Sequence, residues 1–303
     1  MNARRFSRNA LFSQNAQRAG FVIAAIALIF GVWNAVIWIF GLQSFVLPTP
    51  QSAISAVAGQ WSTLAPLTWQ TVKETAEGFF VGAAIGFVLA VGMSALRPVQ
   101  RLIYPALIGS QAVPIVAIAA PLVILFGFGA LPKLIIVAWC VFFPVVVSVL
   151  DGLAHIDQDL VNLARVLGAR RVREFIDIRL PATLSPLFSG LKIGATYAVT
   201  GAVIGEWTAS SQQGLGTFLL SANSSLNAAL VFGVTLLLTA IGVLSFLLVM
   251  AVESVATPWR SRSTAPGTLR RLGLGRFPGQ APSGAAGPGT AEARRLASTR
   301  HEQ

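Results

Sequence analysis

The sequence predicts an all-α membrane protein that crosses its bilayer about six times, and two properties of the chain lead to this prediction. Of its 303 residues, 54% are hydrophobic and only 11% are charged, whereas about 25% of an average soluble domain is charged. Crossing a hydrocarbon core takes about 20 apolar residues in a helix. Long stretches carry no charge, namely those between Arg18 and Lys73, Glu77 and Arg97, Arg101 and Lys133, and Glu206 and Glu253.

The predicted spans are residues 20–42, 76–96, 103–127, 132–151, 187–208 and 229–253. Helices are expected because lipid cannot hydrogen-bond an open backbone, and the stretches do not alternate as barrel strands do. The first stretch is longer than the roughly 7–15 apolar residues of a signal peptide, so it is predicted to be retained. Segment 20–64 then combines the first span with an external part, in which Pro50 begins a short helix on the membrane surface.

The distribution of positive charge predicts the orientation. Of the 22 Lys and Arg residues, nineteen lie in the N-terminal segment 1–19, in the loops 97–101 and 152–186, or after residue 253. Lys73 and Lys133 fall on the opposite side, and Lys192 lies within the fifth span. Because positive loops stay in the cytoplasm, both termini are predicted to be cytoplasmic. The net charge of +11 is thus attributed to orientation and not to nucleic-acid binding.

Residues 256–303 form a tail rich in Pro, Gly, Ala, Ser and Arg, which is predicted to be a disordered, basic cytoplasmic segment.

Two spans carry small residues at a spacing of four, which lets helix backbones approach closely. They are Gly78, Gly82 and Gly86 in the second span, and Gly190 and Gly194 in the fifth. Prolines inside the third and fourth spans predict kinks, which can line a pathway but are also ordinary in membrane bundles.

The loop 152–186 is predicted to form two short helices. Asp157 caps the first helix and Asp159 adds favourable negative charge to its first turn. Apolar residues then recur at helical spacing as far as Leu167, and Gly168 follows where a left-handed C-cap favours glycine. Pro181 is expected to end the second helix, and Ser185-Pro186 to begin the next span. The apolar face of this pair can lie on the membrane, on the protein's own core or in a groove of a partner.

This loop resembles the cytoplasmic motif of permease subunits of binding-protein-dependent ATP-binding cassette (ABC) importers: Glu-Ala-Ala, three residues, Gly, nine residues, Ile, one residue, Leu-Pro. The chain reads Asn162-Leu163-Ala164, three residues, Gly168, nine residues, Ile178, Arg179, Leu180-Pro181. Asn162-Leu163 replaces Glu-Ala, which puts any contact of the motif glutamate in doubt. The resemblance implies an ATPase-coupling loop that includes Asp159, Asn162, Leu163, Ala164, Leu167, Gly168, Ala169, Ile178, Leu180 and Pro181.

Other segments resemble the nitrate, sulfonate, taurine and pyrimidine-precursor branch of this family. They are Ser110-Gln111-Ala112-Val113-Pro114-Ile115, Phe126-Gly127-Phe128-Gly129, Gly205-Glu206-Trp207 and Gly214-Leu215-Gly216. The first and third look closest to permeases for thiamine-pyrimidine precursors or riboflavin. Gln111, Pro114 and Glu206 are therefore candidate pathway or gate residues, although a glutamate near the interface can equally be solvated or paired.

The resemblance implies a type I ABC importer permease fold with its core at residues 65–255, in a bacterial inner membrane. It implies a permease dimer, expected to be a homodimer, two cytoplasmic ATPases, and a periplasmic or lipid-anchored binding protein that delivers a small organic solute. The sequence agrees on one independent point: none of the three lysines follows a glycine, so the chain has no P-loop. It is expected not to be an enzyme and to bind no cofactor, with ATP used by the partner.

Two alternatives remain at this point. An ion-coupled secondary transporter would be expected to show ionisable groups at mid-membrane and two repeated halves. A membrane-embedded enzyme would need a polar catalytic cluster. The sequence indicates neither, and with Cys140 as its only cysteine it suggests no metal site.

Overall fold

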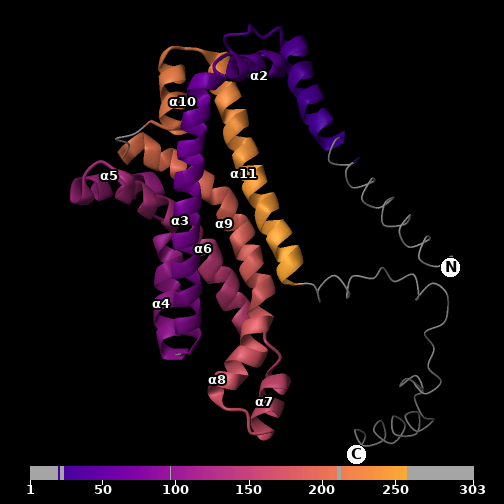
Figure 1. The fold of residues 1–303 in the computed structure, drawn as a ribbon, viewed down its shortest axis with the longest axis vertical. Coiled ribbons are helices and arrows are strands. Elements are labelled where there is room, and N and C mark those ends of the chain that lie inside the picture. Colours follow the sequence, from indigo (N-terminus) through magenta and orange to yellow (C-terminus); the bar gives the residue numbers. More distant parts are fainter. Residues whose placement is uncertain (1–19, 21–23, 96, 210–212, 258–303) are drawn as a thin grey trace, which may run out of the picture. The chain divides into compact units, whose positions relative to one another are not determined.

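The computed structural model describes residues 20, 24–95, 97–209 and 213–257, and all regular structure within these ranges is helical (Figure 1). The prediction of an all-α fold is thereby confirmed. The helices are α2 (Pro50–Gly59), α3 (Trp61–Ala95), α4 (Arg97–Ser110), α5 (Ile115–Phe126), α6 (Ala130–Ala154), α7 (Gln158–Val166), α8 (Arg171–Glu174), the π-helix η1 (Phe175–Arg179), α9 (Leu180–Ala209), α10 (Leu215–Ser224) and α11 (Ala228–Ala256). The predicted segment 1–19 and the tail from residue 258 lie outside the described residues.

Four helices in the described ranges are long and apolar enough to cross a membrane, namely α3, α6, α11 and the continuous helix Phe175–Ala209. The pair α4 and α5 makes a fifth crossing if it is counted as one broken span. A shorter apolar helix, Ala24–Phe40, occupies the first predicted span. The Trp33 indole donates a hydrogen bond to the Pro48 carbonyl oxygen (3.1 Å) and its ring lies 5.6 Å from that of Phe232 in α11.

Helix α6 lies at the centre of the core, between α3 and α9. Every small residue of the two predicted stripes is buried, and each faces α6. A Cβ atom at Gly78 or Gly82 would overlap α6, and one at Gly190 would lie 2.7 Å from the Pro144 carbonyl oxygen. The stripes therefore bring α3 and α9 against neighbouring sides of α6, at backbone contact distance, and α3 and α9 also contact each other.

The second span begins well before its predicted start at residue 76, because α3 already begins at Trp61. Lys73 made this region look like a loop. It is exposed, however, and its ammonium lies 3.9 Å from the Glu77 carboxylate one turn along the same helix. The short helix predicted in segment 20–64 is α2, which does begin at Pro50 and is capped by Thr49.

The third predicted span is two helices and not one. α4 ends at Ser110, α5 starts at Ile115, and their axes differ by 97°. Pro114 has no backbone N–H and disfavours helical geometry in the residue before it, which explains why the helix stops here. The apolar character of the segment is the same on both sides of the break, so hydropathy does not locate it.

The predicted helix end at Pro181 and new start at Ser185-Pro186 are wrong. The chain continues from α8 through η1 into α9 without interruption. The Leu180 N–H bonds to the Phe175 carbonyl oxygen, five residues back, which is the π-type pattern. This wider turn accommodates a proline that would otherwise clash in a regular helix.

Candidate functional site

The predicted coupling loop forms one end of the described structure, where α7 and α8 lie at the foot of the bundle (Figure 1). The Asp157 carboxylate accepts a hydrogen bond from the Asp159 N–H (2.9 Å) and so caps α7. Gly168 follows with a φ of +83°, the left-handed conformation expected of a glycine C-cap. The Ala169 N–H bonds to the Ala164 carbonyl oxygen (2.9 Å), which closes the turn toward α8.

Glu174 joins the two halves of this loop. Its carboxylate accepts hydrogen bonds from Arg165 on α7 (2.9 and 3.2 Å) and from Arg179 in η1 (2.7 and 2.9 Å), and the residue is only 4% exposed. The hydrogen bonds from Arg165, followed by those from Arg179, lower the pKa of Glu174 below its usual range. Two guanidinium groups on one buried carboxylate hold α7 at a fixed angle to the base of α9. This role of Glu174 was not predicted from the sequence.

An open groove of about 740 Å³ lies beside α7. Three leucines line it with more than half of each side chain exposed: Leu160 (54%) and Leu163 (56%) of α7, and Leu167 (77%), which follows the last residue of α7. Of the predicted coupling residues, Leu163, Ala164, Leu167 and Ile178 line the groove, whereas Asp159, Asn162, Gly168 and Ala169 lie elsewhere on the loop, and Leu180 and Pro181 form the first turn of α9. An exposed leucine row of this kind is costly for an isolated chain and indicates a surface that another group covers.

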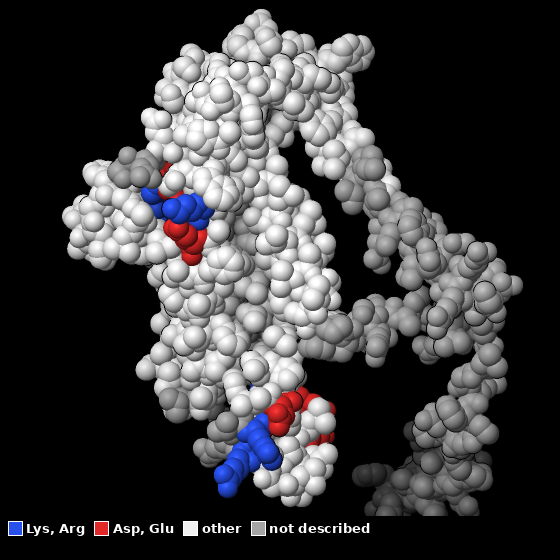
Figure 2. All heavy atoms as spheres, viewed as in Figure 1, with Lys and Arg blue, Asp and Glu red and all other residues white. Residues whose placement is uncertain are grey.

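Charge is concentrated at few places on the molecule. On the face drawn in Figure 2, most Lys, Arg, Asp and Glu atoms gather in two groups, one of them at the end formed by α7 and α8. The surface between the two groups is almost entirely uncharged, which suits a protein surrounded by lipid.

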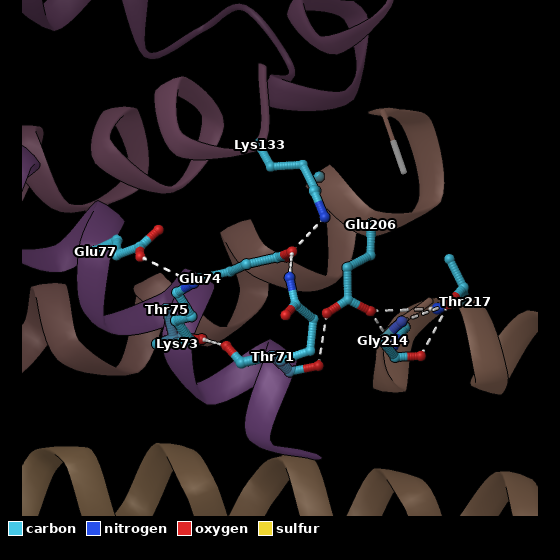
Figure 3. A network of polar contacts seen from close by, with 12 residues as sticks. Thr71, Lys73, Glu74, Thr75, Glu77, Lys133, Glu206, Gly214 and Thr217 are labelled. Atoms are coloured by element: carbon cyan, nitrogen blue, oxygen red, sulfur yellow. Dashed lines mark hydrogen bonds and ion pairs between the residues drawn. The ribbon is translucent and has the colours of Figure 1, made fainter. Parts of the chain in front are cut away.

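At the opposite end of α9, Glu206 caps α10 (Figure 3). One carboxylate oxygen accepts a hydrogen bond from the Gly216 N–H (2.6 Å), and the other accepts one from the Thr71 hydroxyl of α3 (2.6 Å). The Thr71 hydroxyl oxygen in turn accepts the Leu215 N–H (2.9 Å). A Cβ atom at Gly214 would overlap the Glu206 carboxylate, so this approach requires glycine. The Gly-Glu-Trp and Gly-Leu-Gly motifs are therefore two halves of one helix cap.

Beside this cap, Lys133 of α6 forms an ion pair with Glu74 of α3 (Figure 3). Both residues are buried, at 2% and 7% exposure, and the Gln70 amide also donates to Glu74 (2.6 Å). The second oxygen of Glu74 is buried without a hydrogen-bond partner among the described residues. Lys133, which was counted on the outer side in the charge distribution, lies in the first turn of α6 and is buried in the protein, where Glu74 neutralises it.

These buried pairs were not predicted from the sequence. Lys133, Glu74 and Thr71 all lie near predicted span ends, where polar residues usually face water. A second pair, Lys192 with Glu253 (2.8 Å), links α9 to α11 in the same way. A charge that is left unpaired in a membrane helix is costly, so each of these charged residues is expected to have a partner. The sequence does not identify which residue that partner is.

The other two candidate pathway residues, Gln111 and Pro114, are far along the chain from Glu206 and lie at a different place. They sit in the turn between α4 and α5 and line a cavity of about 510 Å³, whose remaining walls come from α6 and α9. Glu206 is 1% exposed and does not line this cavity. The structure therefore places Gln111 and Pro114 at one cavity and Glu206 in the cap of α10, away from that cavity.

Comparison with known proteins identifies the family. The profile of the "Binding-protein-dependent transport system inner membrane component" family matches residues 82–259. A probable ABC transporter permease protein of Haemophilus influenzae is 34% identical over 71% of this chain and 88% of its own length. The formylaminopyrimidine transport permease protein ThiX of Halalkalibacterium halodurans is 30% identical over 73% and 88%. The riboflavin transport system permease protein RibX of Chloroflexus aurantiacus is 28% identical over 78% and 88%.

A solved structure agrees on the fold. The crystal structure of an amino acid ABC transporter with histidines superposes with a TM-score of 0.52 at 14% sequence identity, and the match covers 67% of this chain and 96% of that one. An ion-coupled secondary transporter, the alternative from the sequence, is not supported by these relatives. The chain therefore belongs to the family of inner-membrane components of binding-protein-dependent transport systems, as a multi-pass permease subunit of an ABC importer.

Proposed function

We propose that this permease is coupled to a separate cytoplasmic ATPase through the groove beside α7. The observation that carries the proposal is the row of exposed leucines, Leu160, Leu163 and Leu167. The helix α7 beside this row is linked to the start of α9 by the hydrogen bonds of Arg165 and Arg179 to Glu174. The groove is lined mainly by apolar residues, with Asp151, Asp157 and Asp177 among the others. A pre-formed groove loses little conformational entropy when a partner fills it. ATPase closure would then push the loop and change the access of the pathway, and the loop itself would carry out no chemistry.

A pair of matched substitutions tests the docking groove. Leu163→Asp places a carboxylate inside the groove, whereas Val166→Asp places the same group on α7 at a side chain that is 85% exposed and does not line the groove. Burying an unpaired charge at the contact should weaken ATPase binding by about tenfold or more. The measurement is co-purification and binding of the ATPase to the permease in nanodiscs. Equal binding by the two variants would refute the groove as the docking site.

The same proposal fixes the orientation and the partners. The α7–α8 end would face the cytoplasm with both termini, two copies of the chain would form the pathway, and an external binding protein would supply the solute. A reporter fused after Val255 should then read as cytoplasmic, and an external reading would contradict this topology. Deletion of residues 260–303 should leave uptake largely intact.

The transported solute is proposed to be a small organic molecule. The relatives are named for transport of formylaminopyrimidine, riboflavin, aliphatic sulfonates and taurine. The cavity at the α4–α5 turn, which holds Gln111 and Pro114, is the proposed part of the pathway in this chain. Its volume of about 510 Å³ falls within the roughly 300–1,000 Å³ of small-molecule sites.

A further inference from the structure

The cavity at the α4–α5 turn is built from five parts of the chain. Ile108 comes from α4, Gln111 and Pro114 come from the turn, and Ile115 begins α5. The remaining lining residues lie between Trp139 and Ser148 of α6, or are Ile193 and Tyr197 of α9. The axes of α4 and α5 differ by 97° at this turn.

Aromatic rings line this cavity from two helices. Trp139 of α6 lies one turn from Phe143, with ring centres 5.3 Å apart and planes at 76°, and the buried Phe143 supports the Trp139 ring edge to face. Tyr197, 53% exposed, borders the cavity from α9. Flat rings on two walls favour a flat ring between them, through offset stacking or edge contacts.

The polar groups of the lining are all uncharged. They are the Gln111 amide, the Ser148 and Tyr197 hydroxyls and the Cys140 thiol, and the lining contains no Lys, Arg, His, Asp or Glu. The Gln111 oxygen can accept N–H groups, and the Gln111 amide and the hydroxyls can donate to ring nitrogens or carbonyls.

We propose that this cavity selects an uncharged, planar heteroaromatic solute, such as an aminopyrimidine or a flavin ring, over a sulfonate or taurine. The proposal rests on the transport function proposed above and narrows its substrate class. A sulfonate group would be moved out of water with no cation to pair with it, which is strongly unfavourable. A neutral ring with N–H and carbonyl groups finds stacking surfaces and uncharged hydrogen-bond partners in the same space.

The test is direct binding to the permease–ATPase complex in nanodiscs, without the binding protein, so that selectivity of the permease alone is measured. Radiolabelled riboflavin and an aminopyrimidine are compared with taurine and an alkanesulfonate by equilibrium dialysis. Trp139→Leu should weaken binding of the aromatic probes about two- to tenfold, since it removes the ring and keeps apolar bulk, whereas Trp139→Phe should largely restore it. Trp69→Leu, at an exposed tryptophan of α3 that does not line the cavity, is the matched control.

Each outcome decides the proposal. Saturable binding of an aromatic probe that responds to Trp139→Leu and not to Trp69→Leu supports it, and the two aromatic probes distinguish a pyrimidine from a flavin. Binding of taurine or the sulfonate with equal or higher affinity, or no binding of either class, overturns it. Loss of the permease dimer in Trp139→Leu also overturns it, because the cavity would then be part of a subunit interface. If aromatic probes bind and Leu163→Asp leaves binding of the ATPase unchanged, the proposal of an ATPase docking groove fails and the proposal of a heteroaromatic solute stands.

Discussion

The cap of α10 by Glu206 leads to a quantitative prediction. Replacing Glu206 with Ala leaves the buried Gly216 N–H without its acceptor, and an unsatisfied buried donor costs about 1–3 kcal/mol. The Thr71 hydroxyl is less affected, because the Leu67 carbonyl oxygen lies 3.1 Å away as an alternative acceptor. We therefore expect Glu206→Ala to lower the free energy of unfolding by about 1–3 kcal/mol from this bond, with a further loss from the cavity left behind.

Glu206→Gln is the matched variant. A glutamine keeps a carbonyl oxygen for the Gly216 N–H, and its amide can donate to the Thr71 hydroxyl oxygen, so it should cost less than about 1 kcal/mol. The assay is unfolding of the purified permease in a detergent titration, followed by tryptophan fluorescence, with hydrogen exchange of the α10 amides as a local readout. If Glu206→Gln destabilises the protein as much as Glu206→Ala, the carboxylate charge and not the cap is what matters. If neither variant changes stability, the cap contributes nothing.

Three further predictions concern the coupling loop and the packing of α6. Stability of the loop should be constant above the usual glutamate pKa of 4.5 and should fall as the pH drops below it, because the folded state lowers the pKa of Glu174. Hydrogen exchange of the loop amides as a function of pH measures this stability, and Glu174→Gln should remove its dependence on pH. Gly168→Val should cost about 1–2 kcal/mol at its φ of +83° and abolish ATP-driven uptake while membrane insertion stays normal; unimpaired uptake would contradict the assignment. Gly82→Ala should separate α3 from α6, since its Cβ would overlap Ala138, and should lower the unfolding midpoint, whereas Gly92→Ala meets no atoms within 4 Å and should not.

The local signals of the loop were predictable from the sequence, because they depend on neighbours a few residues away. Asp157 caps the helix that follows it, and Gly168 adopts the left-handed conformation at its end. The rules for caps refer to the backbone of the same turn, so no knowledge of the tertiary structure is needed.

The helix cap on α10 was not predictable, since it depends on groups far apart in the chain. Glu206 and Thr71 are separated by 135 positions, and only the packing of α3 against α9 brings them together. The sequence placed Glu206 near a membrane interface and left open whether it was solvated, paired or part of a gate. Its burial at 1% exposure and its hydrogen bonds to α10 resolve that question in favour of a paired group.

Pro181 shows where a sequence rule fails for a physical reason. A proline usually ends a helix because it removes a donor and clashes with the preceding turn. Here the π-type turn from Phe175 to Arg179 widens the helix just before the proline. Sequence patterns give the preference of a residue for regular geometry, but they do not reveal which irregular geometry the surrounding structure supports.

The unbroken path from η1 into α9 has a mechanical consequence. Phe175–Ala209 is a single helix of 35 residues, which at a rise of about 1.5 Å per residue is roughly 50 Å long. Its first turn adjoins the Glu174 clamp and its last turn carries the Glu206 cap. One continuous helix thus links the α7–α8 loop to the cap of α10, and the π-type turn and Pro186 are two irregular points along it at which a helix can bend. A displacement of the loop end reaches α10 except for the part that bending at these two points takes up.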